Sequence, residues 1–72
     1  MTTTSETIEI RGFHCSGCAD NLSEALNRLD GVIVARADFD RRNLSIRFDA
    51  DRVSESDIDA RIRAAGFEPV RA

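Results

Sequence analysis

The sequence is poor in the residues that build covalent or metal-braced frameworks: it has two cysteines, one histidine and one proline among 72 residues. Cys15 and Cys18 lie too close together to form a structural disulfide framework. A closed structural zinc site takes a full set of Cys and His ligands, which this chain does not have. We therefore expect both thiols to be available for metal binding or redox chemistry.

Long hydrophobic runs are also absent, and none approaches the roughly 20 residues needed to cross a bilayer. The segment Met1–Thr7 lacks the basic and apolar regions of a signal peptide, which predicts a cytoplasmic location. Thirteen acidic residues against ten basic ones give a net charge of −3, which argues against nucleic-acid binding. The adjacent basic residues Arg41 and Arg42 are interpreted as part of a solvated turn.

Hydrophobic periodicity divides the chain into predicted strands and helices. In chain order these are strand 7–11, helix 19–29, strand 32–39, strand 44–48, helix 55–65 and strand 67–71. This order predicts an α+β, ferredoxin-like βαββαβ sandwich, with a four-stranded antiparallel sheet and two helices on one face. We expect a single domain over residues 1–72, with residues 1–5 disordered and too little core for a catalytic cleft.

The second predicted helix has the clearest boundaries. Ser54 as N-cap, with Asp57 three residues later, predicts a capping box, and Gly66 predicts the end of the helix. Ala65 is expected to complete the apolar stripe of this helix. Pro69 has no amide hydrogen to donate, so the last strand is expected at an edge of the sheet.

The segment Gly12–Cys18, GFHCSGC, joins the first predicted strand to the first predicted helix. Its spacing puts Cys15 just outside the helix and Cys18 on the first turn, so that both sulfurs converge on one ion. A helix N-terminus lowers the pKa of a thiol from about 8.5 towards neutrality, and we expect Cys18 to gain most. Gly12 and Gly17 are expected to let the backbone bend. Two thiolates suit a soft monovalent ion, and an open site suits transfer to an incoming thiolate.

This segment resembles the GMTCxxC motif of heavy-metal-associated domains, found in copper chaperones and at the N-termini of metal-transporting P-type ATPases. The similarity covers residues 7–70 and includes the segments Asp30–Val32 and Ala64–Phe67. It implies that Cys15 and Cys18 bind Cu(I), or Zn(II), Cd(II) or Hg(II) as in some members. The metal would pass to a related domain or to the transport core of a P-type ATPase. A non-catalytic monomer is implied, without membrane insertion, in the cytoplasm or as a cytosolic part of a transporter.

Three positions bear on this resemblance. Phe13 replaces the methionine that packs beneath the metal loop in the family, and we expect it in the core. His14 replaces the usual threonine and is either an exposed loop residue or a third ligand, which would favour Zn(II) or Cd(II). Phe67 holds the family position that faces the metal, where ATPase domains often carry Phe; the alternative is a plain core role.

Two other classes of function remain open from the residues. A CxxC pair at a helix N-terminus is also a thiol-disulfide redox motif, but the longer chain and the flanking aromatic or proline residues of thioredoxin-like sites are missing. A plain protein-interaction module would leave two exposed thiols unexplained. The acidic charge balance predicts a basic surface on the partner.

Overall fold

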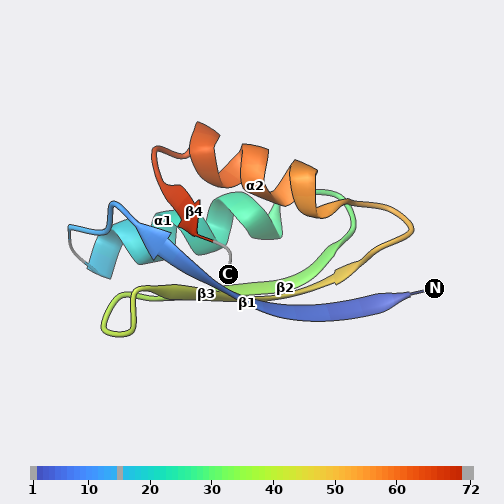
Figure 1. Ribbon diagram of the computed structural model, residues 1–72, viewed down its shortest axis with the longest axis horizontal. Helices are drawn as coiled ribbons and strands as arrows, with labels where there is room; N and C mark the ends of the chain where they lie inside the picture. The colour runs from blue at the N-terminus through green and yellow to red at the C-terminus, as the bar shows by residue number, and fades with distance from the viewer. Residues whose placement is uncertain (1, 15, 71–72) are drawn as a thin grey trace.

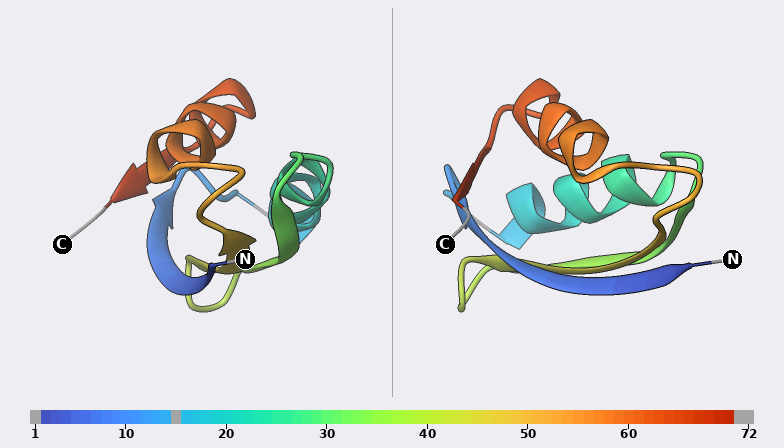
Figure 2. Two further views of the ribbon diagram at one scale, coloured as in Figure 1. Left: turned by 90° about the vertical axis from the view of Figure 1, so that its right-hand side faces the viewer. Right: turned by 45° about the vertical axis from the view of Figure 1, so that its right-hand side comes forward.

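The computed structural model describes residues 2–14 and 16–70 of the chain. The elements are β1 (Thr3–Arg11), α1 (Ser16–Asn27), β2 (Val32–Asp38), β3 (Asn43–Asp49), α2 (Glu55–Ala64) and β4 (Glu68–Val70). The strands form an antiparallel sheet in the order β2-β3-β1-β4. Both helices cover the same face of this sheet (Figures 1 and 2). The predicted ferredoxin-like sandwich is confirmed.

Strand β1 begins earlier than the sequence pattern predicts. The expected disorder over residues 1–5 is wrong for residues 3–5, which pair with β3 from Thr3, opposite Asp49, onwards. The backbone carbonyl of Thr2 also accepts a hydrogen bond from the amide of Ala50 at 2.7 Å. These residues are polar and give no hydrophobic signal. Their backbone is ordered because β3 offers N–H and C=O groups that need partners along its length.

The hydrophobic core lies between the sheet and the two helices. Alternate residues of β1 and β3 point into it, and α1 and α2 contribute residues at helical spacing. Its largest fully buried members are Ile10, Leu22, Leu26, Leu44, Phe48, Ile58 and Ile62. Burying one such side chain contributes about 1.5–3 kcal/mol to the free energy of unfolding, so this set stabilises the fold substantially.

Helix α2 begins as predicted and ends one residue early. The Ser54 hydroxyl accepts a hydrogen bond from the amide of Asp57, and the Asp57 carboxylate accepts one from the amide of Ser54, both at 3.1 Å. Ala65, expected in the apolar stripe, is instead an exposed C-cap, because the last helical residue is Ala64. Pro69 lies in the edge strand β4, opposite Ile10, as its missing amide hydrogen predicted.

Candidate metal centre

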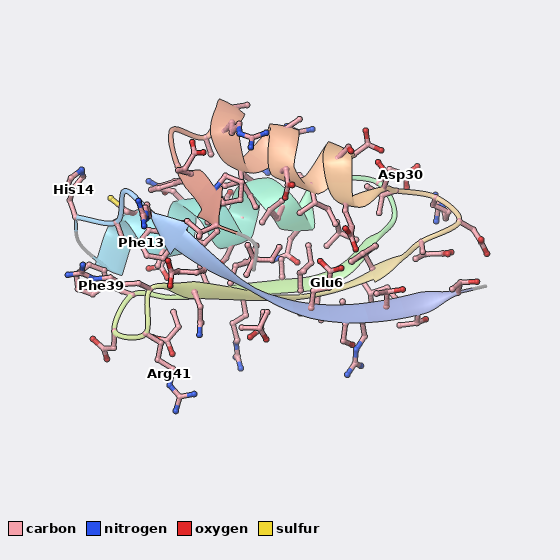
Figure 3. The ribbon with its side chains drawn as sticks, viewed as in Figure 1. Glu6, Phe13, His14, Asp30, Phe39 and Arg41 are labelled. Carbon is pink, nitrogen blue, oxygen red and sulfur yellow. The ribbon has the colours of Figure 1, made fainter. Side chains whose placement is uncertain are left out.

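The connection between β1 and α1 lies at one end of the molecule. β1 ends at Arg11 and α1 begins at Ser16, and Figure 3 places His14 at the tip of the loop between them. The β2–β3 turn and the α2–β4 connection reach the same end (Figure 1). Cys15, the first predicted ligand, lies outside the described residues. The described part of the site is therefore the segment Gly12–His14 and the start of α1.

Cys18 lies in the first turn of α1, where the sequence predicts it. It is partly exposed, and it packs against the edge of the core. The first turn of α1 contains no acidic residue, so no carboxylate on that turn offsets the positive end of the helix dipole. The setting therefore favours a negatively charged thiolate at Cys18. Its role as a metal ligand stays a prediction.

Gly12 turns the chain out of β1 in the left-handed region, with φ +109°. A Cβ atom there would lie 3.3 Å from Cδ1 of Phe67 and 3.5 Å from the carbonyl oxygen of Gly66. The backbone conformation therefore favours glycine strongly, and a Cβ atom would also crowd the Phe67 ring. Gly17, expected to help bend the loop, lies instead inside α1 and is not among the positive-φ glycines. Its predicted role in the bend is wrong, because the helix already begins at Ser16.

The base of the loop rests on an aromatic pair. Phe13 is buried, with 8% of its surface exposed, which confirms its predicted core role. Its ring meets that of Phe67 edge to face, with centroids 5.2 Å apart and planes at 69°. Phe67 is partly exposed and also packs against the core. Such a pair contributes about 0.5–1.5 kcal/mol beyond burial, and it joins the β1–α1 loop to the α2–β4 connection.

His14 is exposed, and Figure 3 shows its ring extending away from the sheet and the helices. Within residues 2–14 and 16–70, no group of three or more His, Cys, Asp and Glu side chains could hold a metal ion. The predicted ligand set depends on Cys15, so both the CxxC site and the third-ligand role of His14 stay predictions. In the same part of the chain, no helix has the length and apolar character needed to span a membrane.

The fold is an antiparallel α+β sandwich, and a thiol lies in the first turn of its first helix. Comparison with known proteins places the chain more closely: it belongs to the heavy-metal-associated domain family, whose model matches residues 7–68. The family resemblance carried by the segment Gly12–Cys18 is thus confirmed.

Relatives and solved structures support the same family. An uncharacterized protein of Haemophilus influenzae is 37% identical over 62 residues, which cover 86% of this chain and 90% of that protein. Copper chaperone CopZ of Staphylococcus saprophyticus is 32% identical over 63 residues, which cover 88% of this chain and 93% of the chaperone. The crystal structure of a copper-binding domain from HMA7, a P-type ATPase, matches with a TM-score of 0.88 and 29% identity, covering 92% of this chain and 89% of that one.

Proposed function

We propose that this domain binds one Cu(I) ion through the thiolates of Cys15 and Cys18 and passes it on by ligand exchange. The observation that carries the proposal is the position of Cys18, partly exposed in the first turn of α1 and beside the loop that leads from β1. The helix dipole and the amide groups of this turn favour a thiolate. Two thiolates suit a soft monovalent ion that accepts low coordination. A two-coordinate site that is open to an incoming ligand would also let a thiolate of an acceptor replace one ligand at a time.

The metal is cargo in this proposal, and no catalytic role is assigned to the isolated domain. The core closes without a metal, because side chains such as Leu22, Leu26, Ile58 and Ile62 are fully buried against one another and the sheet. A metal held only to brace the fold would normally be enclosed by a complete ligand set. The exposed loop at the end of the molecule suits transfer better than bracing.

The partner in this proposal is another metal-binding domain or the transport core of a P-type ATPase. One relative is described as a copper chaperone, and one structural neighbour is a copper-binding domain of a P-type ATPase. These two descriptions support two settings for this domain, a free metallochaperone in the cytoplasm and a cytosolic part of a transporter. Both settings use the same chemistry at Cys15 and Cys18.

A second candidate is a Zn(II)- or Cd(II)-binding domain in which His14 is a third ligand. The observation that favours it is the exposure of His14 at the tip of the loop, directly before Cys15 in the chain. Imidazole nitrogen suits divalent ions better than a pair of thiolates alone. The thiol-disulfide redox alternative has less support, because β1 has antiparallel neighbours on both sides and thioredoxin-like sites use a parallel pair.

Competition with bathocuproine under excess reductant tests the Cu(I) site. The wild-type domain is expected to hold one Cu(I) per chain, and Cys15→Ser and Cys18→Ser are each expected to lose it, because a hydroxyl is a poor ligand for a soft ion. Ser45→Ala, an exposed position on the open face of the sheet, is the control and should bind as wild type. Wild-type affinity in both serine variants would refute the site.

A further inference from the structure

The sheet ends on two edge strands, β2 and β4, and both are protected against pairing with another chain. Along β2, the side chains of Ser23 and Asn27 in α1 form hydrogen bonds with backbone groups of the strand. An irregularity between Val32 and Val34 also interrupts the pairing register of β2. β4 is three residues long and contains Pro69. Covering groups, bulges, short length and proline are usual means by which proteins keep sheet edges from associating.

A further edge results from the difference in length between β1 and β4. β1 has nine residues, and β4 pairs only with residues 9–11 of that strand. The amide of Ile10 donates a hydrogen bond to the carbonyl of Arg42, on the β3 side of β1, at 2.9 Å. Because successive residues alternate, the backbone groups of residues 3, 5 and 7 point to the opposite side. We call residues 3–7 the free edge: in the part of the chain that the structure describes, no strand lies beside them on that side.

The free edge is held in place, although its side chains are polar. The carbonyl of Thr2 accepts a hydrogen bond from the amide of Ala50 at 2.7 Å, and the Thr2 hydroxyl donates one to the carboxylate of Asp51 at 3.2 Å. β3 pairs with the inner side of the free edge from Thr3 onwards. Figures 1 and 2 show this half of β1 at the margin of the sheet, at the far end from the β1–α1 loop. A partner strand would therefore meet an ordered edge, which lowers the entropy cost of binding.

The sequence of the free edge is self-complementary in one antiparallel register. When Ser5 faces Ser5 of a second copy, Thr3 faces Thr7 and Thr4 faces Glu6. No two like charges then face one another directly, and cross-strand pairs of threonine and serine stabilise a sheet. In this register the outward-pointing residues 3, 5 and 7 pair only with residues 7, 5 and 3, as the exchange of backbone hydrogen bonds requires. The segment also has no proline, no lysine and no bulge to prevent pairing.

We propose that the free edge of β1 pairs with the free edge of a second copy of this chain. The two sheets then join across a two-fold axis that passes beside Ser5. The paired segment is five residues long, and so short an interface buries less surface than a stable dimer needs. The dimer is therefore weak and forms at high local concentration, where it replaces the monomer that the family resemblance implies. The pairing uses no thiol and no metal, so it goes beyond the proposed function and does not depend on it.

This arrangement leaves both copies of the β1–α1 loop open. An antiparallel pairing centred on Ser5 points the two β1 strands in opposite directions, and each strand ends at its own loop. The loops thus lie at opposite ends of the joined sheet, away from the interface (Figure 1). Each copy can receive or pass on an ion while it is paired, unlike two domains that share one ion between their thiols.

Sedimentation equilibrium of the full chain, reduced and in excess chelator, tests for the dimer from micromolar to millimolar concentration. The apparent mass should rise towards that of two copies, and added salt should strengthen the association, because each copy has a net charge of −3. Ser5→Lys should weaken the dimer roughly two- to fivefold, because two lysines then face one another across the axis.

Ser45→Lys is the matched control for Ser5→Lys. Both serines are exposed, and each lies opposite an arginine, Arg47 for Ser5 and Arg36 for Ser45. Ser45 is on β3, which has a strand on each side, so Ser45→Lys should dimerise as wild type does. Ser5→Pro should abolish the dimer and keep the circular dichroism of the fold, because the N–H that it removes points away from β3.

A mixture of Ser5→Lys and Ser5→Glu tests the register. The mixed dimer should recover at least the wild-type affinity, because lysine then faces glutamate across the axis. A mixture of Ser45→Lys and Ser45→Glu should gain nothing over wild type. Hydrogen exchange locates the interface: the amides of Thr3, Ser5 and Thr7 should exchange fast in dilute samples and slowly in concentrated ones.

Four results would overturn the edge pairing. These are a single-copy mass at every concentration, equal losses in Ser5→Lys and Ser45→Lys, no recovery in the mixture of Ser5 variants, and slow exchange of the Thr3 and Ser5 amides in dilute samples. The last result would mean that another part of the chain covers the free edge. Chelator excludes metal from these experiments, so their outcome is independent of the Cu(I) competition on Cys15→Ser and Cys18→Ser.

Discussion

Asn27 of α1 satisfies both backbone groups of Ala35 in β2. Its Nδ2 donates to the Ala35 carbonyl at 3.0 Å, and its Oδ1 accepts from the Ala35 amide at 2.8 Å. One turn earlier, Ser23 Oγ accepts a hydrogen bond from the amide of Ala37 at 2.8 Å. β2 is an edge strand, so these two side chains of α1 satisfy backbone groups that would otherwise have no strand partner. Edge strands whose backbone groups are satisfied in this way resist pairing with other chains.

Asn27→Ala is expected to lower the free energy of unfolding by about 1–3 kcal/mol, because it leaves the N–H and C=O of Ala35 without partners. Urea denaturation measures the loss. Asn21→Ala, an exposed position on the same helix with no such hydrogen bond in the described residues, should change stability by less than about 0.5 kcal/mol. Equal losses in the two variants would contradict the pairing of Asn27 with the strand edge.

Gly12→Ala is expected to destabilise the domain and to loosen the Phe13–Phe67 contact. Alanine at a positive φ costs roughly 1–2 kcal/mol, and its Cβ would also press on Cδ1 of Phe67 at 3.3 Å. Thermal unfolding and the ring signals of both phenylalanines in NMR report the two effects.

Gly66→Ala is the matched control for that substitution. Gly66 also has a positive φ, +95°, but a Cβ there would meet no atom within 4 Å. Gly66→Ala should therefore lose stability because alanine is strained at a positive φ, and it should leave the Phe13–Phe67 contact intact. The packing argument fails if Gly66→Ala disturbs the phenylalanine rings as much as Gly12→Ala does.

Metal removal is expected to leave the fold unchanged. The core between the sheet and the helices is already closed by side chains such as Leu22 and Ile62, neither of which is exposed. Circular dichroism of the domain in excess chelator should therefore show its helices, and the thermal midpoint should rise only when metal is added, through binding to the native state. A random-coil spectrum for the apo domain would show that the metal is needed to fold it.

His14→Ala is expected to leave Cu(I) affinity within a few fold of wild type and to weaken Zn(II) and Cd(II) binding. The reason is that two thiolates satisfy a monovalent soft ion, whereas a divalent ion gains from an added nitrogen ligand. Side-by-side competition for the three metals measures this, and metal-edge spectroscopy counts the ligands. Equal effects on all three metals would remove the case for His14 as a divalent-metal ligand. A loss confined to Cu(I) would contradict the predicted preference of His14 for divalent ions.

Local signals in the sequence were enough to predict the order of the elements and the position of Cys18. Ser54 and Asp57 specify the start of α2 because a capping box involves neighbouring residues alone. Pro69 indicates an edge strand because it lacks an amide hydrogen wherever it lies. The spacing of the two cysteines predicts Cys18 on the first turn of a helix, although hydrophobic periodicity alone predicts a helix that begins only at Ala19 and the structure begins it at Ser16. Its place there was confirmed, and the ligand roles of Cys15 and Cys18 remain predictions.

Tertiary structure decided whatever depends on segments distant in the chain. Thr3 lies in a strand because Asp49 lies opposite it, and Phe13 supports the metal loop because Phe67 returns beside it. Arg41 and Arg42 lie in the solvated turn that the sequence predicts, and only the tertiary structure brings this turn back against β1, where the amide of Ile10 donates to the carbonyl of Arg42. Periodicity and capping report on neighbours within about one helical turn. They carry no information about which remote backbone or ring completes a contact.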